Sequence, residues 1–206
     1  MFAAMRSERM EALHLFSDPA TGLEAVVAIH NTRLGPALGG CRYLAYNSLD
    51  DALADAMRLA RGMSYKAALA GLEQGGGKAV ILRQPHIADR AALFEAFGRC
   101  IESLRGGYIT AVDSGTSSAD MDCIAQHTGH VTSTTHAGDP SPHTALGVLA
   151  GMRSAVRARL GQDSLADVRV VVQGLGNVGY ALAQLLQAEG AELLVADLDQ
   201  GKVRLA

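Results

Sequence analysis

Positions 168 to 179 read Val168-Arg169-Val170-Val171-Val172-Gln173-Gly174-Leu175-Gly176-Asn177-Val178-Gly179. The first six of these residues form a nearly continuous apolar run, which is typical of a strand that a parallel sheet buries on both faces. A helical pattern follows the glycines as far as Glu189, and a second strand over 192–196 ends at Asp197. The segment therefore predicts one strand–helix–strand unit of an α/β fold with a parallel sheet.

The glycines of this segment form the spacing G-x-G-x-x-G between a strand and a helix. Gly174 permits a tight turn, Gly176 lets the backbone approach a pyrophosphate, and Gly179 lets the helix pack closely on the strand. Asp197 follows at about the 20 residues at which an acid accepts the adenosine ribose hydroxyls and repels a 2′-phosphate, which favours NAD over NADP. The predicted cofactor-binding residues are Gly174, Leu175, Gly176, Asn177, Val178, Gly179, Tyr180 and Asp197.

A domain boundary is expected at the proline-rich run Asp139-Pro140-Ser141-Pro142, which breaks the chain before a helix over about 143–159. Residues 1–139 form one predicted domain, with a mixed sheet and helices. Residues 140–206 form a linking helix and the first βαβ unit of a Rossmann-type domain. A dinucleotide site needs two mononucleotide halves, so we expect an incomplete cofactor domain in this chain, with 168–206 its least stable region.

The first domain alternates helices with short strands, which indicates an α/β layer arrangement. The expected elements are a helical stretch ending over 11–16, a strand over 24–30, a helix that Ser48 caps and Gly62 ends, a strand over 79–82, an amphipathic helix capped by Asp89, a strand over 108–111, a helix capped by Thr116 or Ser117, and an extended run over 130–134.

Composition narrows the class of protein. An apolar share of 49% can bury a core, and the apolar runs are shorter than the roughly 18–20 residues of a membrane helix. A net charge of −3 and an aromatic share of 4% argue against a nucleic-acid surface. Cys41, Cys100 and Cys123 are an odd number without CxxC spacing, which indicates packed thiols. We expect a cytoplasmic protein with small-molecule partners.

Two lysines stand in the segment Met63-Ser64-Tyr65-Lys66-Ala67-Ala68-Leu69-Ala70-Gly71-Leu72-Glu73-Gln74-Gly75-Gly76-Gly77-Lys78, which is otherwise small and uncharged apart from Glu73. Lysine is normally solvated, so Lys66 and Lys78 in this setting suggest ammonium groups directed into a cleft. Desolvation, and the charge of Lys66 if the two converge, would lower the pKa of Lys78. A base near neutrality requires a fall of about three units from roughly 10.4, on the order of 4 kcal/mol.

Of two other interpretations of this glycine–lysine run, the residues exclude the first and leave the second open. A phosphate loop, G-x-x-x-x-G-K-[ST], would need glycine at 72 and Ser or Thr at 79, where the chain has Leu72 and Ala79. A plain glycine turn with a surface lysine is the second alternative.

Asp113 follows the strand over 108–111 and precedes Ser114-Gly115-Thr116. Its carboxylate is therefore expected at the C-terminal end of a strand, where open α/β sheets place ligands. There it could pair with a lysine and transfer protons. A turn or helix-cap aspartate is an equally good interpretation.

Five motifs in order resemble the Glu/Leu/Phe/Val dehydrogenase superfamily, and within it most closely the leucine dehydrogenases. They are Leu34-Gly35-Pro36-Ala37-Leu38-Gly39-Gly40-Cys41-Arg42, the segment from Lys66 to Lys78, Tyr108-Ile109-Thr110-Ala111 with Asp113-Ser114-Gly115-Thr116, Pro140-Ser141-Pro142-His143-Thr144-Ala145, and Gln173-Gly174-Leu175-Gly176-Asn177-Val178.

The resemblance implies NAD-dependent oxidative deamination of an aliphatic L-amino acid to a 2-oxo acid and ammonia. Lys78 would act on the water that attacks the imine carbon, and Asp113 would exchange protons with the amino group. The substrate-binding residues it implies are Lys66 for the carboxylate, Met63 and the Gly39 and Gly40 backbone in support, Leu38 and Ala111 in the side-chain pocket, and Thr132. Thr144 would lie near the nicotinamide. A homo-oligomer assembled through the first domain is also implied.

Val112 departs from the acidic residue that several relatives carry before the aspartate. The family's cofactor domain also extends further than this chain, so an inactive fragment that acts only as a folded substrate-domain and oligomerisation module is the alternative function. A zinc module built on Cys123, His127, His130, His136 and His143 is a third possibility, but its spacing matches no structural zinc pattern.

Overall fold

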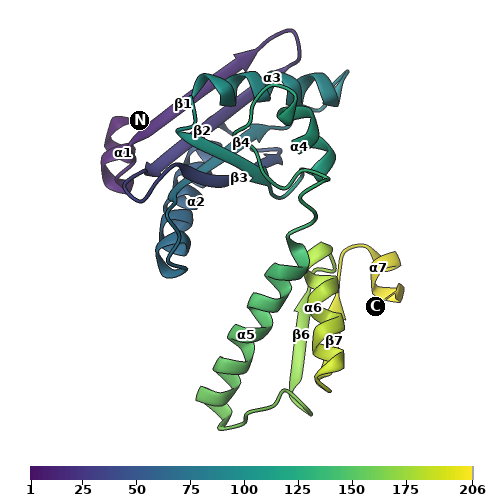
Figure 1. Cartoon of the computed structure of the whole chain (residues 1–206). Helices are drawn as coiled ribbons and strands as arrows, with labels where there is room; N and C mark the ends of the chain where they lie inside the picture. Colours follow the sequence, from purple (N-terminus) through teal and green to yellow (C-terminus); the bar gives the residue numbers. More distant parts are fainter. Residues whose placement is uncertain (206) are drawn as a thin grey trace. The chain divides into compact units, whose positions relative to one another are not determined.

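The computed structural model describes residues 1–205, which form two compact units that divide between Gly138 and Asp139 (Figure 1). In chain order the first unit contains α1 (Phe2–Glu8), β1 (Ala12–Asp18), β2 (Leu23–Asn31), β3 (Ala37–Leu44), α2 (Leu49–Leu69), β4 (Gly75–Leu82), α3 (Arg90–Ser103), β5 (Tyr108–Val112) and α4 (Ser118–Ala125).

The sheet of the first unit has the strand order β1-β2-β4-β3-β5. The strands β1, β2 and β4 pair antiparallel, whereas β3 runs parallel to both β4 and β5. The mixed sheet expected for this part of the chain is confirmed. Because β4, β3 and β5 run in one direction, the segments that follow them emerge at one edge of the sheet.

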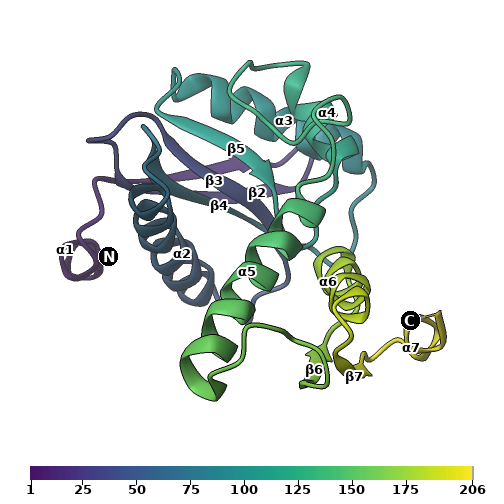
Figure 2. The same cartoon turned by 60° about the horizontal axis from the view of Figure 1, so that its bottom comes forward.

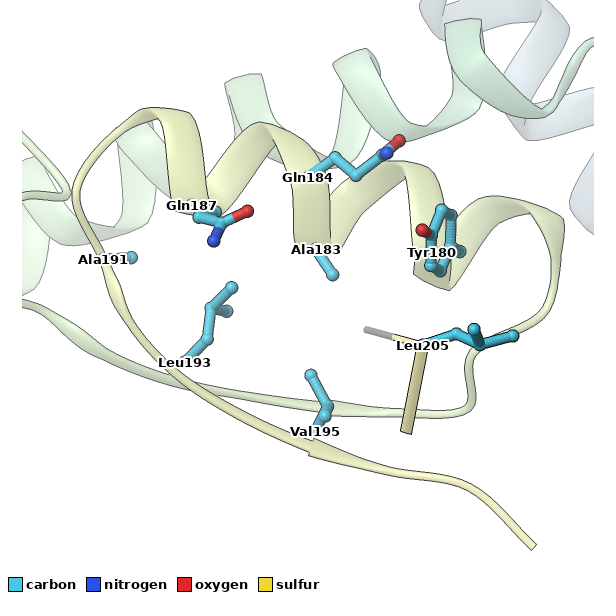
Figure 3. A pocket seen from close by; sticks show the side chains of 8 residues that line it. All are labelled: Tyr180, Ala183, Gln184, Gln187, Ala191, Leu193, Val195 and Leu205. Carbon is cyan, nitrogen blue, oxygen red and sulfur yellow. The ribbon is translucent and has the colours of Figure 1, made fainter. Parts of the chain in front are cut away.

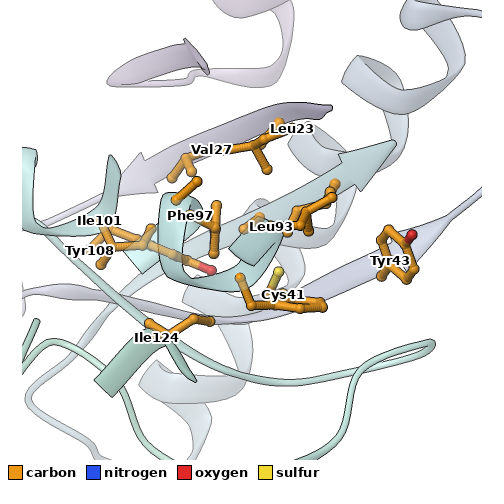
Figure 4. Close-up of a cluster of buried hydrophobic side chains, with 14 of the residues drawn as sticks. Leu23, Val27, Cys41, Tyr43, Leu93, Phe97, Ile101, Tyr108 and Ile124 are labelled. Atoms are coloured by element: carbon orange, nitrogen blue, oxygen red, sulfur yellow. The ribbon is translucent and has the colours of Figure 1, made fainter. Parts of the chain in front are cut away.

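Helices cover both faces of this sheet, with α2 on one side and α3 and α4 on the other (Figure 2). The larger core lies under α3 and α4, where Phe94, Phe97 and Tyr108 are fully buried (Figure 4). The smaller core joins α2 to β2 and β4 through Ala56, Ala28 and their neighbours. Since α2 packs mainly on β2 and β4 and little on β3, it covers its side of β3 and β5 only in part.

Helix caps account for several element starts. Ser48 accepts a hydrogen bond from the N–H of Asp51 at the start of α2, and Asp89 accepts one from Ala92 at the start of α3. Ser117 and Asp120 form a capping box at α4. Each of these satisfies an N–H group that the helix itself leaves without a partner.

Two local predictions were wrong. Residues 11–16 are not helical, because 12–18 form β1, whose apolar side chains pair with β2 in a register that sets Leu13 opposite Ala28. Gly62 does not end the helix either, since α2 continues to Leu69. The cost of about 1 kcal/mol for a glycine inside a helix is offset by the packing of α2, which buries Ala60 before it and Ala67 after it.

The second unit contains α5 (Ser141–Leu160), β6 (Arg169–Gln173), α6 (Asn177–Ala188), β7 (Glu192–Ala196) and α7 (Gln200–Leu205). Its two strands pair in parallel, with Val171 opposite Leu194, as the strand–helix–strand pattern predicted. Its core is small, and Leu165 and Leu186 are the side chains in it that are fully buried. The burial on both faces that the apolar run predicted is not seen in the described residues, since Val171 and Leu194 remain 65% and 52% exposed on the other face.

We expect the second unit to unfold locally more often than the first. A two-stranded sheet with one apolar face in water has little buried area to hold it. Amide hydrogen exchange should therefore be faster in β6 and β7 than in β4 by several orders of magnitude. Equal protection in the two units would contradict this expectation.

Within residues 1–205, none of the helices combines the length and the apolar character that a membrane crossing requires.

Candidate functional site

The uncovered part of the sheet on the α2 side carries the residues that the sequence singled out. Successive residues of a strand face opposite sides, and Cys41 and Tyr43 belong to the core under α3. Their even-numbered neighbours on β3 therefore face the α2 side. The parallel register places Leu38 opposite Gly76 and opposite Ile109, so β4, β3 and β5 present one continuous surface beside α2.

Lys78 lies inside β4, and its ammonium group is 2.6 Å from Oδ2 of Asp113, just after β5. Lys78 is only 5% exposed, whereas the Asp113 side chain is 23% exposed at the rim. The structure thus brings the two predicted catalytic residues into direct contact. It also excludes the phosphate loop, because Gly75, Gly76 and Gly77 are strand residues rather than a loop before a helix.

A third charged group joins the pair. Arg42, on β3, donates from Nε to the same Oδ2 of Asp113 at 2.9 Å, and from a terminal nitrogen to Asp55 at 2.8 Å. The sequence offered Lys66 as a cation that would act on Lys78 if the two converged, and Arg42 was not predicted in this place. The signal was present in the alternation along β3, which puts residue 42 on the same face as Gly40.

The charges of this site shift its titration in definite directions. Burial lowers the pKa of Lys78 below its usual value; the hydrogen bond to Asp113 opposes this shift, and the nearby charge of Arg42 adds to it. Partial burial raises the pKa of Asp113, but the hydrogen bonds from Lys78 and Arg42 outweigh burial and hold it below its usual value. Arg42 and Lys78 are two cations beside the single carboxylate of Asp113. Because the guanidinium keeps its charge, Lys78 is the group whose loss of a proton relieves the excess positive charge.

Three glycines make room for this arrangement. A Cβ atom on Gly40 would lie 2.7 Å from the carbonyl oxygen of Val112 and 3.3 Å from the Lys78 ammonium. A Cβ on Gly76 would meet the backbone of Ser64 in α2 at 2.2 Å, and one on Gly77 would meet the Tyr108 ring at 2.6 Å. The glycines before Lys78 therefore admit α2 and Tyr108 against β4, a role for which ligand access is not needed.

The remaining residues predicted for the substrate lie on several elements of the first unit, and their predicted contacts with a substrate stay predictions. Leu38, on β3, and Ala111, on β5, are half-buried on the α2 side of the sheet. Met63 is half-buried in α2, and Lys66 is exposed in its last turn. Gly39 is buried and its carbonyl accepts a hydrogen bond from the Tyr108 hydroxyl. Thr132 is exposed and donates its N–H to Thr110 at 2.9 Å.

In the second unit, the glycine turn has the shape that the sequence pattern predicts. Gly174 has a φ of +98°, a conformation that favours glycine. A Cβ on Gly179 would lie 1.9 Å from the carbonyl oxygen of Gly174, so only glycine lets α6 approach β6 this closely. Gly176 begins α6 with open space beside its Cα, where a helix N-terminus can receive an anion.

Asp197 is tied to this turn. Its Oδ2 accepts the N–H of Leu175 at 2.6 Å and its Oδ1 accepts the N–H of Asp199 at 2.8 Å. The hydrogen bonds from Asp199 and Leu175 hold the pKa of Asp197 below its usual value. Asp197, Gly174 and Gln173 line one hollow at the ends of β6 and β7, which is where parallel sheets bind ligands.

Tyr180 and Thr144 lie apart from that hollow within the second unit. Tyr180 lines a different one, between α6, β7 and Leu205 (Figure 3). Thr144 is exposed in the first turn of α5, where its hydroxyl donates to the carbonyl of Pro140 at 3.2 Å. Their predicted contacts with a cofactor stay predictions.

The cysteines and histidines of the alternative zinc module are dispersed. Within residues 1–205, no three His, Cys, Asp or Glu side chains come together as a metal site. Cys41, Cys100 and Cys123 are free thiols, and Cys41 is fully buried.

The chain combines a mixed α/β domain with a Rossmann-type strand–helix–strand unit. The family model described as Glu/Leu/Phe/Val dehydrogenase, dimerisation domain, matches residues 11–130, and the model described as Glutamate/Leucine/Phenylalanine/Valine dehydrogenase matches residues 139–203. The chain belongs to the Glu/Leu/Phe/Val dehydrogenase family, as the five motifs suggested.

Individual relatives support this membership. The leucine dehydrogenase of Geobacillus stearothermophilus is 49% identical over 100% of this chain and 57% of its own length. The valine dehydrogenase of Streptomyces coelicolor is 48% identical over 94% of this chain and 54% of its own. The crystal structure of L-tryptophan dehydrogenase from Nostoc punctiforme gives a TM-score of 0.72 at 38% identity, covering 100% of this chain and 58% of that one. The chain thus spans a little over half the length of these relatives.

Proposed function

We propose that the protein carrying this sequence catalyses the NAD-dependent oxidative deamination of a branched-chain aliphatic L-amino acid, namely leucine, valine or isoleucine. The observation that carries the proposal is the part-buried contact of 2.6 Å between Lys78 and Asp113, on the α2 side of the sheet, in a member of this family. A lysine with a lowered pKa beside a carboxylate is suited to proton transfer near neutral pH.

The proposed roles are those that membership of this family implies. Lys66 binds the substrate carboxylate, with Met63, Thr132 and the backbone of Gly39 and Gly40 in support. A bound NAD would supply the acceptor for the α-hydride, whose loss turns the amino group of the substrate into an iminium. Neutral Lys78 then takes a proton from the water that adds to the imine carbon. Asp113 exchanges protons with the nitrogen, which leaves as ammonia when the 2-oxo acid forms.

The substrate class rests on the side chains near the pair. Leu38 and Ala111 are apolar and face the same side of the sheet as Lys78. They offer a glutamate side chain no charge to bind, and a buried, unpaired carboxylate costs several kcal/mol. The relatives named as leucine and valine dehydrogenases agree with an aliphatic substrate.

The proposed cofactor is NAD, bound by the turn from Gly174 to Tyr180, with Thr144 near the nicotinamide. Asp197 disfavours NADP because its carboxylate would face the 2′-phosphate. We expect Asp197→Ala to weaken NAD binding by about tenfold and to reduce the ratio of the affinity for NAD to that for NADP. Calorimetric titration with both dinucleotides measures this, and an unchanged preference would refute the role of Asp197.

A homo-oligomer is the proposed assembly, built through the first unit, whose family model is described as a dimerisation domain. Among the described strands, β1 pairs only with β2, so its outer edge is available to a second copy.

Free thiols at all three cysteines agree with a reducing compartment, and we propose the cytoplasm.

The proposal is tested by NADH formation from NAD and L-leucine, L-valine or L-isoleucine, with L-glutamate and D-leucine as matched controls. The expected result is NADH formation with the branched L-amino acids, in equal amount to the ammonia released. If glutamate is the amino acid that gives NADH and the branched ones do not, the proposed substrate class is wrong. If none of the amino acids gives NADH, the proposed function is wrong.

A further inference from the structure

Arg42 is placed to act on the proposed catalytic pair. Its side chain is 19% exposed and lies between two carboxylates, with Asp113 on one side and Asp55 of α2 on the other. The planar guanidinium suits such a position, because its several N–H groups can bind two acceptors at fixed angles.

The far end of Arg42 is held firmly. The side chain of Asp55 is 14% exposed. Its carboxylate accepts hydrogen bonds from Arg42, from the hydroxyl of Tyr46 and from Arg58, each at 2.8 Å. Asp55 is therefore fully used within the protein. This chain of contacts connects α2 and the segment after β3 to the rim of the site.

The Nε atom of Arg42 donates a hydrogen bond to the same oxygen of Asp113 as the ammonium of Lys78. Both donate to Oδ2 of Asp113, at 2.9 Å and 2.6 Å. Among the described residues, Oδ1 of Asp113 has no protein hydrogen-bond partner. The N–H of Asp113 donates to the hydroxyl of Thr116 at 2.8 Å, which fixes the backbone beneath the carboxylate. Asp113 thus has one oxygen bound by the protein and one left for another group.

We propose that Arg42 is a positioning residue of the reaction: it holds Asp113 by Oδ2, leaves Oδ1 to the substrate nitrogen, and remains the counter-ion of Asp113 when Lys78 loses its proton. The inference rests on the proposed function for its chemical meaning. Its structural part, the dependence of Lys78 on Arg42, can be tested without turnover.

The charged groups around Lys78 determine how the loss of Arg42 would change the pKa of Lys78. Arg42 is permanently positive, Asp113 is negative, and Asp55 is already neutralised by Arg42 and Arg58. Burial raises the pKa of the Cys41 thiol, and burial together with Asp55 raises that of Tyr46 to about 12, so both stay uncharged near neutrality. Without Arg42, Lys78 would be the remaining cation on Asp113 and would hold its proton to higher pH.

The experiment uses residues 1–206, which contain the three lysines Lys66, Lys78 and Lys202. Lysine labelled at the ε-carbon gives three NMR signals, and Lys78→Met identifies that of Lys78. In Arg42→Gln, the Lys78 signal should titrate at higher pH than in the wild type. In an active preparation, the rising limb of the pH profile of kcat should move the same way, with kcat at neutral pH lower on the order of tenfold and KM little changed.

Arg58→Gln is the matched control, because Arg58 also binds Asp55 but is 70% exposed and does not contact Asp113. It should leave the Lys78 titration as in the wild type. Arg42→Lys, which keeps the charge but cannot span both carboxylates, should leave the titration nearer to the wild type and still lower kcat. This variant also serves if Arg42→Gln does not fold.

Two results would overturn the inference. One is a Lys78 titration that does not change in folded Arg42→Gln, and the other is an unchanged kcat in Arg42→Lys. Failure of the proposed function is distinct from both. In that case no amino acid gives NADH, yet the Lys78 signal still responds to Arg42.

Discussion

Lys78→Met is expected to lower kcat for amino-acid oxidation by about 10²–10⁴-fold, the usual loss when a general base is removed. Methionine has a similar length and no charge, so the cavity in β4 stays filled. Asp113 retains Arg42 at 2.9 Å and is not left without a counter-ion. Because burial disfavours charged Lys78, the melting temperature should be unchanged or higher.

The assay for this prediction is steady-state NADH formation across pH, with thermal unfolding measured on the same preparation. Lys202→Met is the control, since Lys202 is an exposed residue of α7. It should keep full kcat. If well-folded Lys78→Met keeps most of the wild-type kcat, another group is the base.

Asp113→Asn is expected to lose kcat to a similar extent, about 10²–10⁴-fold, and also to lose stability. The amide cannot exchange protons with the substrate nitrogen, and it leaves Lys78 and Arg42 as adjacent cations without a carboxylate between them. Removing one partner of such a cluster costs about 2 kcal/mol. The variant should therefore be both inactive and less stable, unlike Lys78→Met.

The stability loss in Asp113→Asn has a definite pH dependence. The pKa of Asp113 is lower in the folded protein than in the unfolded chain, so its carboxylate stabilises the fold above the unfolded value of about 3.9 and ceases to do so as pH falls through the lower folded value. The difference in unfolding free energy from wild type should be full at neutral pH and vanish in acid. Urea unfolding at several pH values measures it. Asp163→Asn, which breaks an exposed pair with Arg157, should show almost no difference at any pH.

The sequence predicted the second unit well because its signals are local. The apolar run, the three glycines and Asp197 each belong to one strand–turn–helix–strand segment, and β6, α6 and β7 form where that segment predicts them. The caps Ser48, Asp89 and Ser117 are local in the same sense.

Predictions failed where tertiary packing decides. Residues 11–16 have an apolar pattern too short to separate helix from strand, and pairing with β2 determines the outcome. Likewise, the glycine run reads as a turn before a strand, yet α2 and Tyr108 pack against its open backbone and make it part of β4. Arg42 was missed for a related reason: its role depends on Asp113, 71 residues away along the chain.

The role of Lys78 as the base is tested by the titration of its side chain in the wild-type chain. Lys78 is buried and contacts Asp113, which Arg42 also contacts, and there it can lose its proton more readily than a free side chain. The NMR signal of Lys78 should therefore titrate below the roughly 10.4 of an unperturbed lysine. A Lys78 signal that titrates at or above that value would contradict its assignment as the base of the reaction.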